Sequence, residues 1–368
     1  MKIQDITSFL ETVAPPDLQE SYDNAGLLTG SQEWHCTGII TSLDATEDVI
    51  MEAARLNCNL VIAHHPIIFG GLKKINDKNY VGKAVIAAIK NDIAIYAIHT
   101  NLDNVINGVN GKMADMLGLI NRRILSPKKN MLKKLVTFVP HHQAMEVRNA
   151  LFAAGAGNVG NYSECSFNMR GEGTFKGNEL TSPFVGEAGV RHTENETRIE
   201  VIFPGWLESK VLKAMIKAHP YEEVAYDMFS LNNIHQDVGS GMVGELELEM
   251  KERDFLAFLQ KQFGLQLIRH TPLTGKTVKK VALCGGAGSF LINAAVAVGA
   301  DFYVTGDVKY HEFFDANGRL VVADIGHYES EQFTVDLLFD ILREKFPNFA
   351  VQKTRIKTNP VNYFTPGI

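Results

Sequence analysis

The sequence predicts an α/β protein whose core consists of two similar α/β halves, interrupted by an inserted ferredoxin-like domain. Two observations predict this class. Short apolar runs alternate with helical segments in both outer parts of the chain, which is typical of layers built on a largely parallel sheet. The middle part has a different order of elements. The expected boundaries are residues 1–131 for the first half, 132–231 for the insert and 232–368 for the second half.

The first half contains three apolar runs with the length of buried strands. Between them lie segments whose apolar residues recur with helical spacing. A short amphipathic helix is expected before them, ended by Pro15 and Pro16. The expected strands are Gly38–Leu43, Asn59–Ala63 and Ile93–Ile98, and the expected helices are Glu47–Leu56 and Lys83–Asn91.

The second half repeats this rhythm. Overlaying the two halves aligns GIITSLDAT with VALCGGAGS, CNLVIAHHP with ADFYVTGDV, and IYAIHTNLD with ADIGHYESE. His99 then lies on His327, and Asp103 lies on Glu331. A unit used twice suggests a site shared by both halves. The expected strands here are Lys279–Leu283, Phe302–Thr305 and Leu320–Ile325, with a helix over Phe290–Val298.

The insert has the order β-α-β-β-α-β, which is that of the split βαβ or ferredoxin-like unit. Within it, Gly171–Gly177 is expected to form a flexible hairpin, with binding of an anion as the alternative, and Thr181–Glu196 is expected to be a loop. The expected strands are Lys134–Pro140, Cys165–Phe175, Thr197–Phe203 and Val224–Phe229, and the expected helices are Ala144–Ala154 and Leu207–Ala218.

Composition excludes several classes of function. The chain has 368 residues, 45% of them hydrophobic, and a net charge of −6. That charge makes general nucleic-acid binding and binding to anionic membranes unfavourable. No apolar run approaches the ~18 residues that a membrane span requires. The N-terminus lacks a secretory pattern and the four cysteines are scattered, so a cytoplasmic protein with reduced thiols is expected.

Five residues carry the expected chemistry: His64, His65, Asp103, His327 and Glu331. Each lies at the carboxyl end of a predicted parallel strand or a few residues beyond it, which is the edge where open α/β sheets place their sites. Imidazoles and carboxylates together can complete the coordination of two divalent cations about 3.5–4 Å apart. The alternative is a structural polar cluster without metal.

The local spacing refines this metal hypothesis. His64 and His65 would point to opposite faces of an ideal strand, so the site requires them in the turn at Pro66. His327 and Glu331 face the same way if GHYESE opens a helix. A mixed imidazole–carboxylate set accepts Zn, Fe, Mn, Co or Ni, and the sequence does not choose among them.

Six runs of the outer segments together resemble the NIF-three-like family, also labelled GTP cyclohydrolase I type 2 homologue. The C-terminal TNPVNYF and the run HPYEEVAYD, which ends the insert of longer bacterial members, extend the resemblance to essentially the whole chain. The six runs are YDNAGLLTG, LDAT, AHHP, HTNLD, TGDVKYH and GHYESE.

The resemblance implies a dinuclear metal site at the same five residues. It also implies a toroidal homohexamer whose sites face an internal cavity, and an insert similar to PII or CutA modules. The label implies GTP cyclohydrolase action, in which water attacks C8 of the guanine ring and formate leaves. The residues themselves show ligands and no guanine pocket.

Other candidates are less specific. The run Gly285–Ser289 follows a strand and could offer backbone N–H groups to an anion, or be a tight turn of small residues. His99 is either a donor that orients a ligand carboxylate or a core histidine. Cys284 is expected to be a packed thiol. Substrate contact or proton transfer, with a polar turn as the alternative, is expected of Asp307, Lys309 and His311.

The sequence is compatible with two functions. The first is a metal-dependent hydrolase acting on a nucleotide or a phosphorylated small molecule. The second is a non-enzymatic protein that holds metal or senses a ligand through the insert. Release of formate and phosphate from nucleotides, with and without added metal, distinguishes them.

Overall fold

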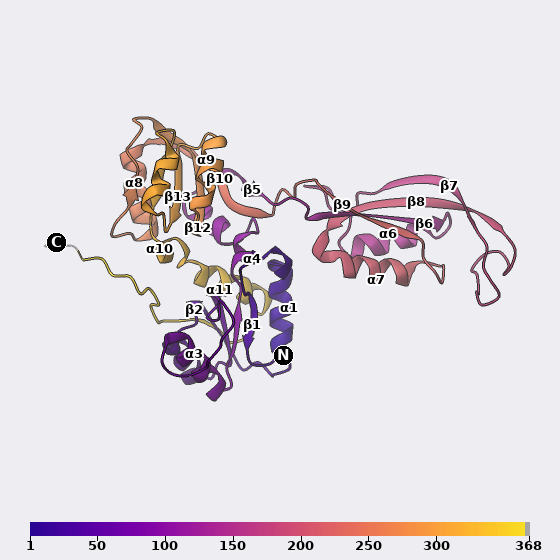
Figure 1. The fold of residues 1–368 in the computed structure, drawn as a ribbon, viewed down its shortest axis with the longest axis horizontal. Coiled ribbons are helices and arrows are strands. Elements are labelled where there is room, and N and C mark those ends of the chain that lie inside the picture. The colour runs from indigo at the N-terminus through magenta and orange to yellow at the C-terminus, as the bar shows by residue number, and fades with distance from the viewer. Residues whose placement is uncertain (365–368) are drawn as a thin grey trace. The chain divides into compact units, whose positions relative to one another are not determined.

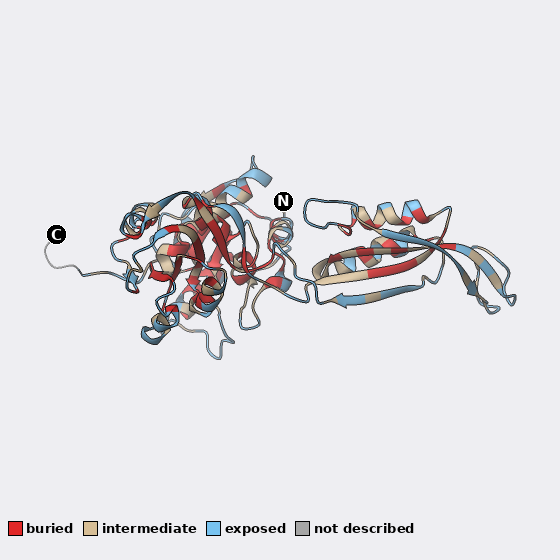
Figure 2. Cartoon of the chain, turned by 90° about the horizontal axis from the view of Figure 1, so that it is seen from above, coloured by how far each residue is buried: buried red, intermediate tan, exposed pale blue. Residues whose placement is uncertain are grey.

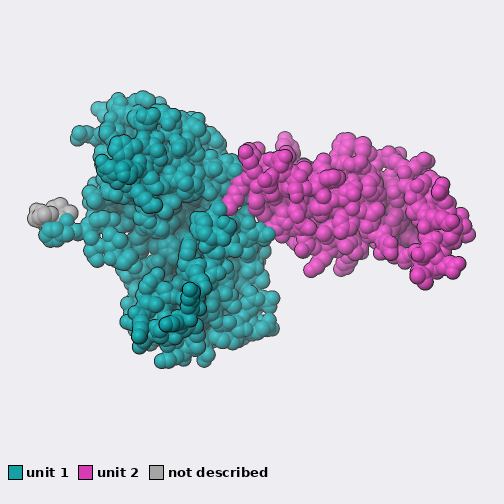
Figure 3. All heavy atoms as spheres, viewed as in Figure 1, with its two compact units in different colours: residues 1–127, 237–368 teal, residues 128–236 magenta. Residues whose placement is uncertain are grey.

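The computed structural model describes residues 1–364 of the chain. These form a mixed α/β structure with three sheets (Figure 1). The chain divides into two compact units, coloured separately in Figure 3. Unit 1 comprises residues 1–127 together with residues 237 onward, and unit 2 comprises residues 128–236.

The first sheet of unit 1 has the strand order β1-β4-β3-β2-β15. Four of its five strands, β15, β2, β3 and β4, are parallel neighbours, and β1 runs antiparallel to β4. The strands are Gly26–Thr29 (β1), Ile39–Asp44 (β2), Leu60–His65 (β3), Ala94–Ala97 (β4) and Val351–Lys353 (β15).

Local signals explain the helices that accompany this sheet. Thr46 caps the next helix by accepting a hydrogen bond from the backbone N–H of Val49, and Asn79 accepts one from Gly82 in the same way. The helices are Ile3–Val13 (α1), Glu47–Arg55 (α2), Tyr80–Lys90 (α3) and Thr334–Lys345 (α11), with a 3₁₀ turn at Pro16–Leu18.

The second sheet of unit 1 has the order β11-β14-β13-β12-β10-β5. Strands β12, β13 and β14 are parallel neighbours. The strands are Ile120–Pro127 (β5), Gly239–Lys251 (β10), Arg269–His270 (β11), Thr277–Ala287 (β12), Phe302–Gly306 (β13) and Val321–Asp324 (β14). Helices Glu252–Phe263 (α8) and Ile292–Ala297 (α9) belong to this region, with 3₁₀ turns at Ser289–Leu291 and Tyr310–Ala316.

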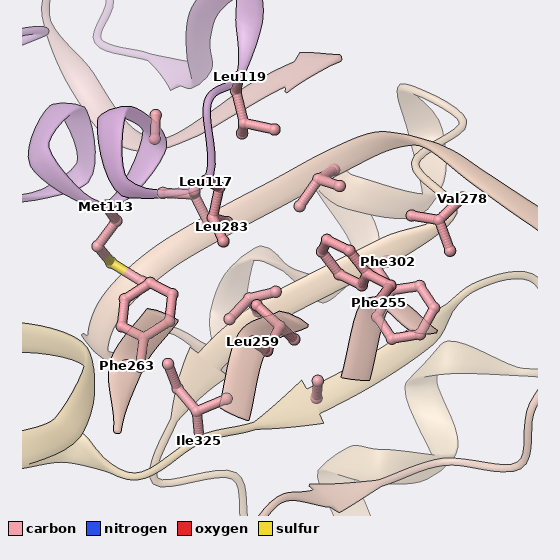
Figure 4. Close-up of a cluster of buried hydrophobic side chains, with 14 of the residues drawn as sticks. Met113, Leu117, Leu119, Phe255, Leu259, Phe263, Val278, Leu283, Phe302 and Ile325 are labelled. Carbon is pink, nitrogen blue, oxygen red and sulfur yellow. The ribbon is translucent and has the colours of Figure 1, made fainter. Parts of the chain in front are cut away.

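Three helices position the site; the first and the last of them directly follow parallel strands, and the middle one follows the first. They are Thr100–Asp103 (α4), Val109–Met116 (α5) and His327–Glu331 (α10). Apolar side chains hold the second sheet against its helices: Phe255 of α8 packs against Phe302 of β13 with ring centroids 4.8 Å apart (Figure 4). The buried residues of unit 1 concentrate around the strands, as Figure 2 shows.

Unit 2 is a four-stranded antiparallel sheet with the order β7-β8-β6-β9. Both of its helices pack on one face of the sheet (Figures 1 and 2). The elements are Leu132–Pro140 (β6), Ala144–Ala153 (α6), Phe167–Phe175 (β7), His192–Pro204 (β8), a 3₁₀ turn Gly205–Leu207, Glu208–Ala218 (α7) and Tyr226–Leu231 (β9). Its classification as ferredoxin-like, and the equivalence of the two halves of unit 1, stay predictions.

Three local predictions are wrong. His64 and His65 do not lie in a turn, because β3 continues through His65. Gly171–Gly177 is not a hairpin: residues up to Phe175 pair with β8. Thr181–Glu196 is not a loop throughout: β8 begins at His192, inside the predicted loop, because its polar residues pair with β7.

The predicted helix over Phe290–Val298 is shorter than expected. A 3₁₀ turn occupies its start, and α9 begins at Ile292. Among the described residues, none of the helices has the length and apolarity that crossing a membrane requires.

Candidate metal centre

All five predicted ligands lie in unit 1 and converge in space. His64 and His65 are the last two residues of β3. Asp103 is the last residue of α4, just after β4, whereas His327 and Glu331 are the first and last residues of α10, just after β14. Each of these elements is a parallel strand or directly follows one, so the carboxyl ends of strands in both sheets supply the cluster.

The Glu331 carboxylate lies at the centre of this cluster. Its Oε2 is 2.9 Å from His65 Nε2 and 3.1 Å from His327 Nε2. Its other oxygen, Oε1, is 3.8 Å from His64 Nε2. The carboxylate therefore bridges His64 and His65 although the two are neighbours on one strand; their ring centroids are 5.0 Å apart.

The potential ligand atoms form two groups that share Glu331. One group is His65, His327 and Glu331, and the other is His64, Asp103 and Glu331. Within each group the ligand atoms lie within 4.8 Å of one another. Two clusters joined by one carboxylate match what a bridged pair of metal ions requires.

The second group contains two polar atoms with no partner. His64 Nε2 and Asp103 Oδ1 are buried and make no hydrogen bond, although they lie 3.6 Å apart. An unpaired buried polar atom is costly and needs an explanation. A divalent cation between these two atoms satisfies both, so the residues present fit a metal.

The other ring nitrogen of each histidine is held by an oxygen. Nδ1 of His64 donates to the Ile98 carbonyl at 2.8 Å. Nδ1 of His65 donates to Asp44 Oδ1 at 2.8 Å, and Nδ1 of His327 donates to Asp307 Oδ2 at 2.7 Å. Such partners fix the tautomer that presents Nε2 to a metal and make the imidazole a better ligand.

His99 follows the same pattern. Its Nδ1 donates to Asp23 Oδ1 at 2.8 Å, and Asp23 also accepts the backbone N–H of Thr100 at 3.0 Å. Burial opposes ionisation of Asp23, but the hydrogen bonds from the His99 ring and the Thr100 hydroxyl outweigh it and lower the pKa of Asp23 to about 2. His99 forms a third group of potential ligand atoms with His64 and His65, so it belongs to the cluster and is not an isolated core histidine.

The cluster shifts the pKa values of its two ligand carboxyl groups in opposite directions. Burial raises the pKa of Asp103 well above its usual range, and the negative charge of Glu331 raises it further. Burial also opposes ionisation of Glu331, but hydrogen bonds from His327 and His65, together with the nearby His64 imidazole, outweigh burial and lower the pKa of this carboxyl group.

The pKa values of the imidazoles differ for the same reasons. Burial lowers the pKa of His64. For His65 burial is outweighed by Asp44 and Glu331, which raise its pKa to about 10. Glu331 and Asp307 likewise raise the pKa of His327 to about 9. Without metal the site therefore contains imidazolium groups paired with carboxylates, and metal binding must release their protons.

The glycine run Gly285–Gly288, before the 3₁₀ turn at Ser289–Leu291, has a different role from an anion-binding loop. Side chains already accept hydrogen bonds from its backbone N–H groups: Asn110 from Gly285, Ser330 from Gly286 and Thr305 from Gly288. Gly286 has φ +61°, and a Cβ there would meet Glu331 Oε1 at 2.4 Å. This run therefore leaves room for the central carboxylate.

A cavity of about 1110 Å³ lies against the cluster, within unit 1. His65, His99, Asp103, His327 and Glu331 all line it, whereas His64 is fully buried. Cys284 also lines the cavity but is only 7% exposed, and burial raises the pKa of its thiol, as expected of a packed cysteine. A second cavity of about 530 Å³ contacts His65 and His327 from the side of Asp307.

Sequence reasoning missed the role of three carboxylates. Asp23, Asp44 and Asp307 hold the Nδ1 atoms of His99, His65 and His327, respectively. Each lies inside one of the runs that carry the family resemblance, and this position is the feature of the sequence that could have indicated a role at the site. Substrate contact or proton transfer was expected of Asp307, and that stays a prediction; the structure adds that Asp307 accepts the Nδ1 proton of His327.

Fold and site together define a mixed α/β protein with a histidine–carboxylate cluster of the kind that can hold divalent metal ions. The profile of the family Duf34/NIF3 (NGG1p interacting factor 3) matches residues 1–360. The chain belongs to this family, which confirms the resemblance seen in its motifs.

The chain is similar to relatives and solved structures over nearly its full length. A "GTP cyclohydrolase 1 type 2 homolog" of Halalkalibacterium halodurans is 40% identical over 365 residues, 98% of each chain. A protein of the same name from Bacillus subtilis is 40% identical over 88% of each chain. The crystal structure of a Bacillus cereus protein related to NIF3 has 39% identity and a TM-score of 0.87, covering 99% of both chains.

Proposed function

We propose that this chain binds two divalent metal ions and is a metal-dependent hydrolase that acts on a nucleotide or a phosphorylated small molecule. One observation carries this proposal: the Glu331 carboxylate lies between two groups of ligand atoms, one of which contains two buried polar atoms without partners. His65 and His327 would hold one ion, His64 and Asp103 the other, and Glu331 both. The ligands are nitrogen and oxygen atoms, so Zn, Fe, Mn, Co and Ni all remain suitable.

A bound pair of ions lowers the pKa of a water molecule and polarises a phosphoryl group or an electrophilic ring carbon. The protein's own residues prepare the site for this chemistry. Asp44 and Asp307 orient His65 and His327 through their Nδ1 atoms. Thr358 donates its hydroxyl to Asp44 and so holds that carboxylate in place.

The walls of the larger cavity favour a nucleotide among these substrates. Tyr22, Phe69, Tyr80 and Phe290 line it, and each side chain is more than half exposed. The rings of Tyr22 and Phe69 are stacked with centroids 6.3 Å apart. Exposed aromatic faces at a cavity are suited to stacking on a planar base, which contributes about 1–3 kcal/mol per base in other proteins.

The charge of the same cavity makes the metal ions necessary for an anionic substrate. Its described lining contains the carboxylates of Glu20, Asp44, Asp103 and Glu331 and neither lysine nor arginine. Without metal, the positive charges of the lining are the imidazolium groups of His65 and His327, and both are already paired with carboxylates. A phosphate group would thus find little free positive charge. Binding of a nucleotide should therefore depend on metal as strongly as turnover does.

The names of the relatives support a narrower form of the proposal. Cyclohydrolase action, in which water attacks C8 of guanine and formate leaves, would use the same ligands and the aromatic walls. The decisive experiment incubates the metal-loaded chain with a panel of nucleotides and measures formate and phosphate separately. Asp103→Ala should abolish release of either product, whereas Asp77→Ala, on an exposed loop, should leave it unchanged.

Tight binding of two ions without turnover of any nucleotide would favour the alternative, a non-enzymatic metal-binding or ligand-sensing protein. Equal turnover by the chelated protein would contradict metal dependence itself. Product release that Asp103→Ala leaves intact would contradict the assignment of this site.

The assembly remains part of the proposal. We expect a homohexamer, on the basis of the family resemblance, and the insert is expected to be a separate PII-like or CutA-like folding unit. Leu132 pairs with Leu231, so the two ends of the insert are close together. Light scattering of the purified chain at micromolar concentration tests the hexamer, and a monomeric mass across a dilution series would contradict it.

A further inference from the structure

Unit 2 contains a cavity of its own, of about 700 Å³. This volume is within the range of small-molecule sites, about 300–1,000 Å³. The cavity is lined only by residues of unit 2, so it is separate from the candidate metal centre. Its floor is the face of the sheet opposite the two helices.

Strand alternation establishes which face this is. Ile199 and Val201 of β8 belong to the apolar core that includes α6 and α7. Side chains alternate along a strand, so Glu196 and Arg198 point to the other face. Phe138 lies directly opposite Arg198, and Gly171 directly opposite Glu196, so they share that face.

The floor contains two polar groups with unused hydrogen-bonding capacity. Glu196 is only 8% exposed, and its carboxylate accepts a hydrogen bond from the Tyr221 hydroxyl at 2.8 Å. That bond uses one of about four acceptor positions of a carboxylate. Arg198 pairs with Glu200 through Nη2 at 2.9 Å, but its Nε is buried and has no partner. The floor therefore offers an acceptor and a donor two residues apart, about 7 Å along the strand.

The walls of the cavity are aromatic. The Tyr221 ring lies 5.8 Å from the Phe175 ring and 6.4 Å from the Phe184 ring, measured between centroids. A hydrogen bond of 2.9 Å from the Ser182 backbone to Glu222 joins the loop after β7 to the turn that carries Tyr221. Flat apolar walls over a polar floor suit a planar ring.

We propose that this cavity is a second ligand site, which binds a planar heteroaromatic acid that carries an amino group. The ring lies between the aromatic walls. Its amino group donates to Glu196, and its acidic group accepts from Arg198 Nε. This site is independent of the hydrolase proposed above, because none of the candidate metal ligands lines it.

One position allows the cavity to be filled without disturbing the sheet. A Cβ built on Gly171 meets no atom within 4 Å, and valine is favoured in strands. Gly171→Val should therefore keep the fold and obstruct the ligand. Gly173 is unsuitable, because a Cβ there would meet Glu196 Oε2 at 2.1 Å. Asn168→Val is the matched control, since Asn168 is on the opposite face of the same strand.

The test titrates the full-length chain, treated with chelator, with the fluorescent probe pterin-6-carboxylate. Fluorescence anisotropy should show saturable binding of one probe per chain. The dissociation constant should rise at least tenfold in Gly171→Val and in Arg198→Gln, and stay unchanged in Asn168→Val. Naphthalene-2-carboxylate, which lacks the amino group, should bind at least tenfold more weakly than the pterin.

Four results would overturn this proposal. The first is no saturable binding of the pterin at millimolar concentration. The second is binding that both Gly171→Val and Arg198→Gln leave intact while circular dichroism shows them folded. The third is equal affinity for the two probes. Binding that appears only after metal is restored would assign the probe to unit 1 and would equally overturn the proposal.

Discussion

Asp103 and Glu331 occupy similar positions, each just beyond a parallel strand of one of the two sheets of unit 1, but their pKa values are shifted in opposite directions. Each ends a short helix that follows a parallel strand. Glu331 is nearly buried and faces three imidazoles, which lower its pKa. Asp103 has a raised pKa, and its buried Oδ1 has no partner.

This difference separates a carboxylate that the protein itself stabilises from one that it does not. Glu331 can be ionised without metal because His65 and His327 supply compensating charge. The buried Oδ1 of Asp103 has no partner unless a cation is bound. The site is therefore preorganised around Glu331, and Asp103 is the position at which metal binding gains most.

The largest expected effect follows from removing the shared carboxylate. Glu331→Gln should reduce bound metal from about two ions per chain to well below one, because both groups of ligands include this residue. Elemental analysis of the purified protein measures it. Glu344→Gln, an exposed position on α11, is the control and should keep both ions; full occupancy in the Glu331 variant would exclude a shared carboxylate.

Asp103→Asn should have a smaller and asymmetric effect. It should remove one ion and leave the other on His65, His327 and Glu331. In the metal-free protein at pH 7 the same change should raise Tm by about 2–4 °C, corresponding to roughly 1 kcal/mol, because it replaces a buried carboxylate of raised pKa by a neutral group. Calorimetry after chelation checks this, with Asp77→Asn as control, and a lowered Tm would contradict the comparison.

Asp307→Asn should weaken the site without removing any ligand. Asp307 accepts the Nδ1 proton of His327, and loss of such a partner typically lowers metal affinity 10–100-fold. Competition with a chelating dye measures the affinity of each ion. Asp315→Asn, exposed on the neighbouring 3₁₀ turn, should change nothing; an unchanged affinity in the Asp307 variant would show that this hydrogen bond does not support the metal.

The pH dependence of the metal-free protein tests the ion pairs around Glu331 without any substitution. The folded-state pKa values of His65 and His327, about 10 and 9, lie above the value of about 6.5 for an unfolded histidine. Their contribution to stability is therefore complete below pH 6.5 and is lost as pH rises through 9 to 10. Urea denaturation should show a falling free energy of unfolding between pH 7 and 10.

The metal-loaded protein is the control for this pH series. Its imidazoles bind as neutral ligands, so its free energy of unfolding should not fall in the same way. A metal-free protein whose stability stays level or rises with pH would contradict the assigned ion pairs around Glu331.

The sequence was sufficient to predict which residues come together. Strand ends can be located from short apolar runs, and parallel strands bring their carboxyl ends to one edge, so His64, Asp103 and Glu331 were placed without any contact being known. Strands β2 and β13 begin and end within a residue of their predicted bounds, whereas β3 ends two residues later than predicted.

The hydrogen-bond partners were not predictable in the same way. Asp44 lies beside His65 through the register of β2 and β3, and Asn110 reaches Gly285 from 175 residues away. Such contacts depend on side-chain direction in the assembled core, which local periodicity does not specify. The prediction of a hairpin at the glycines of β7 failed for the same reason. Pairing with β8 keeps these glycines extended, and that pairing is also a tertiary contact.

The central claim is that Glu331 bridges two metal ions, and anomalous diffraction from crystals of the zinc-loaded protein tests it most directly. We expect two anomalous peaks about 3.5–4 Å apart, one beside His65 and His327 and the other beside His64 and Asp103. Both should lie at bonding distance from the Glu331 carboxylate. A single peak, or a pair of which one does not contact Glu331, would contradict it.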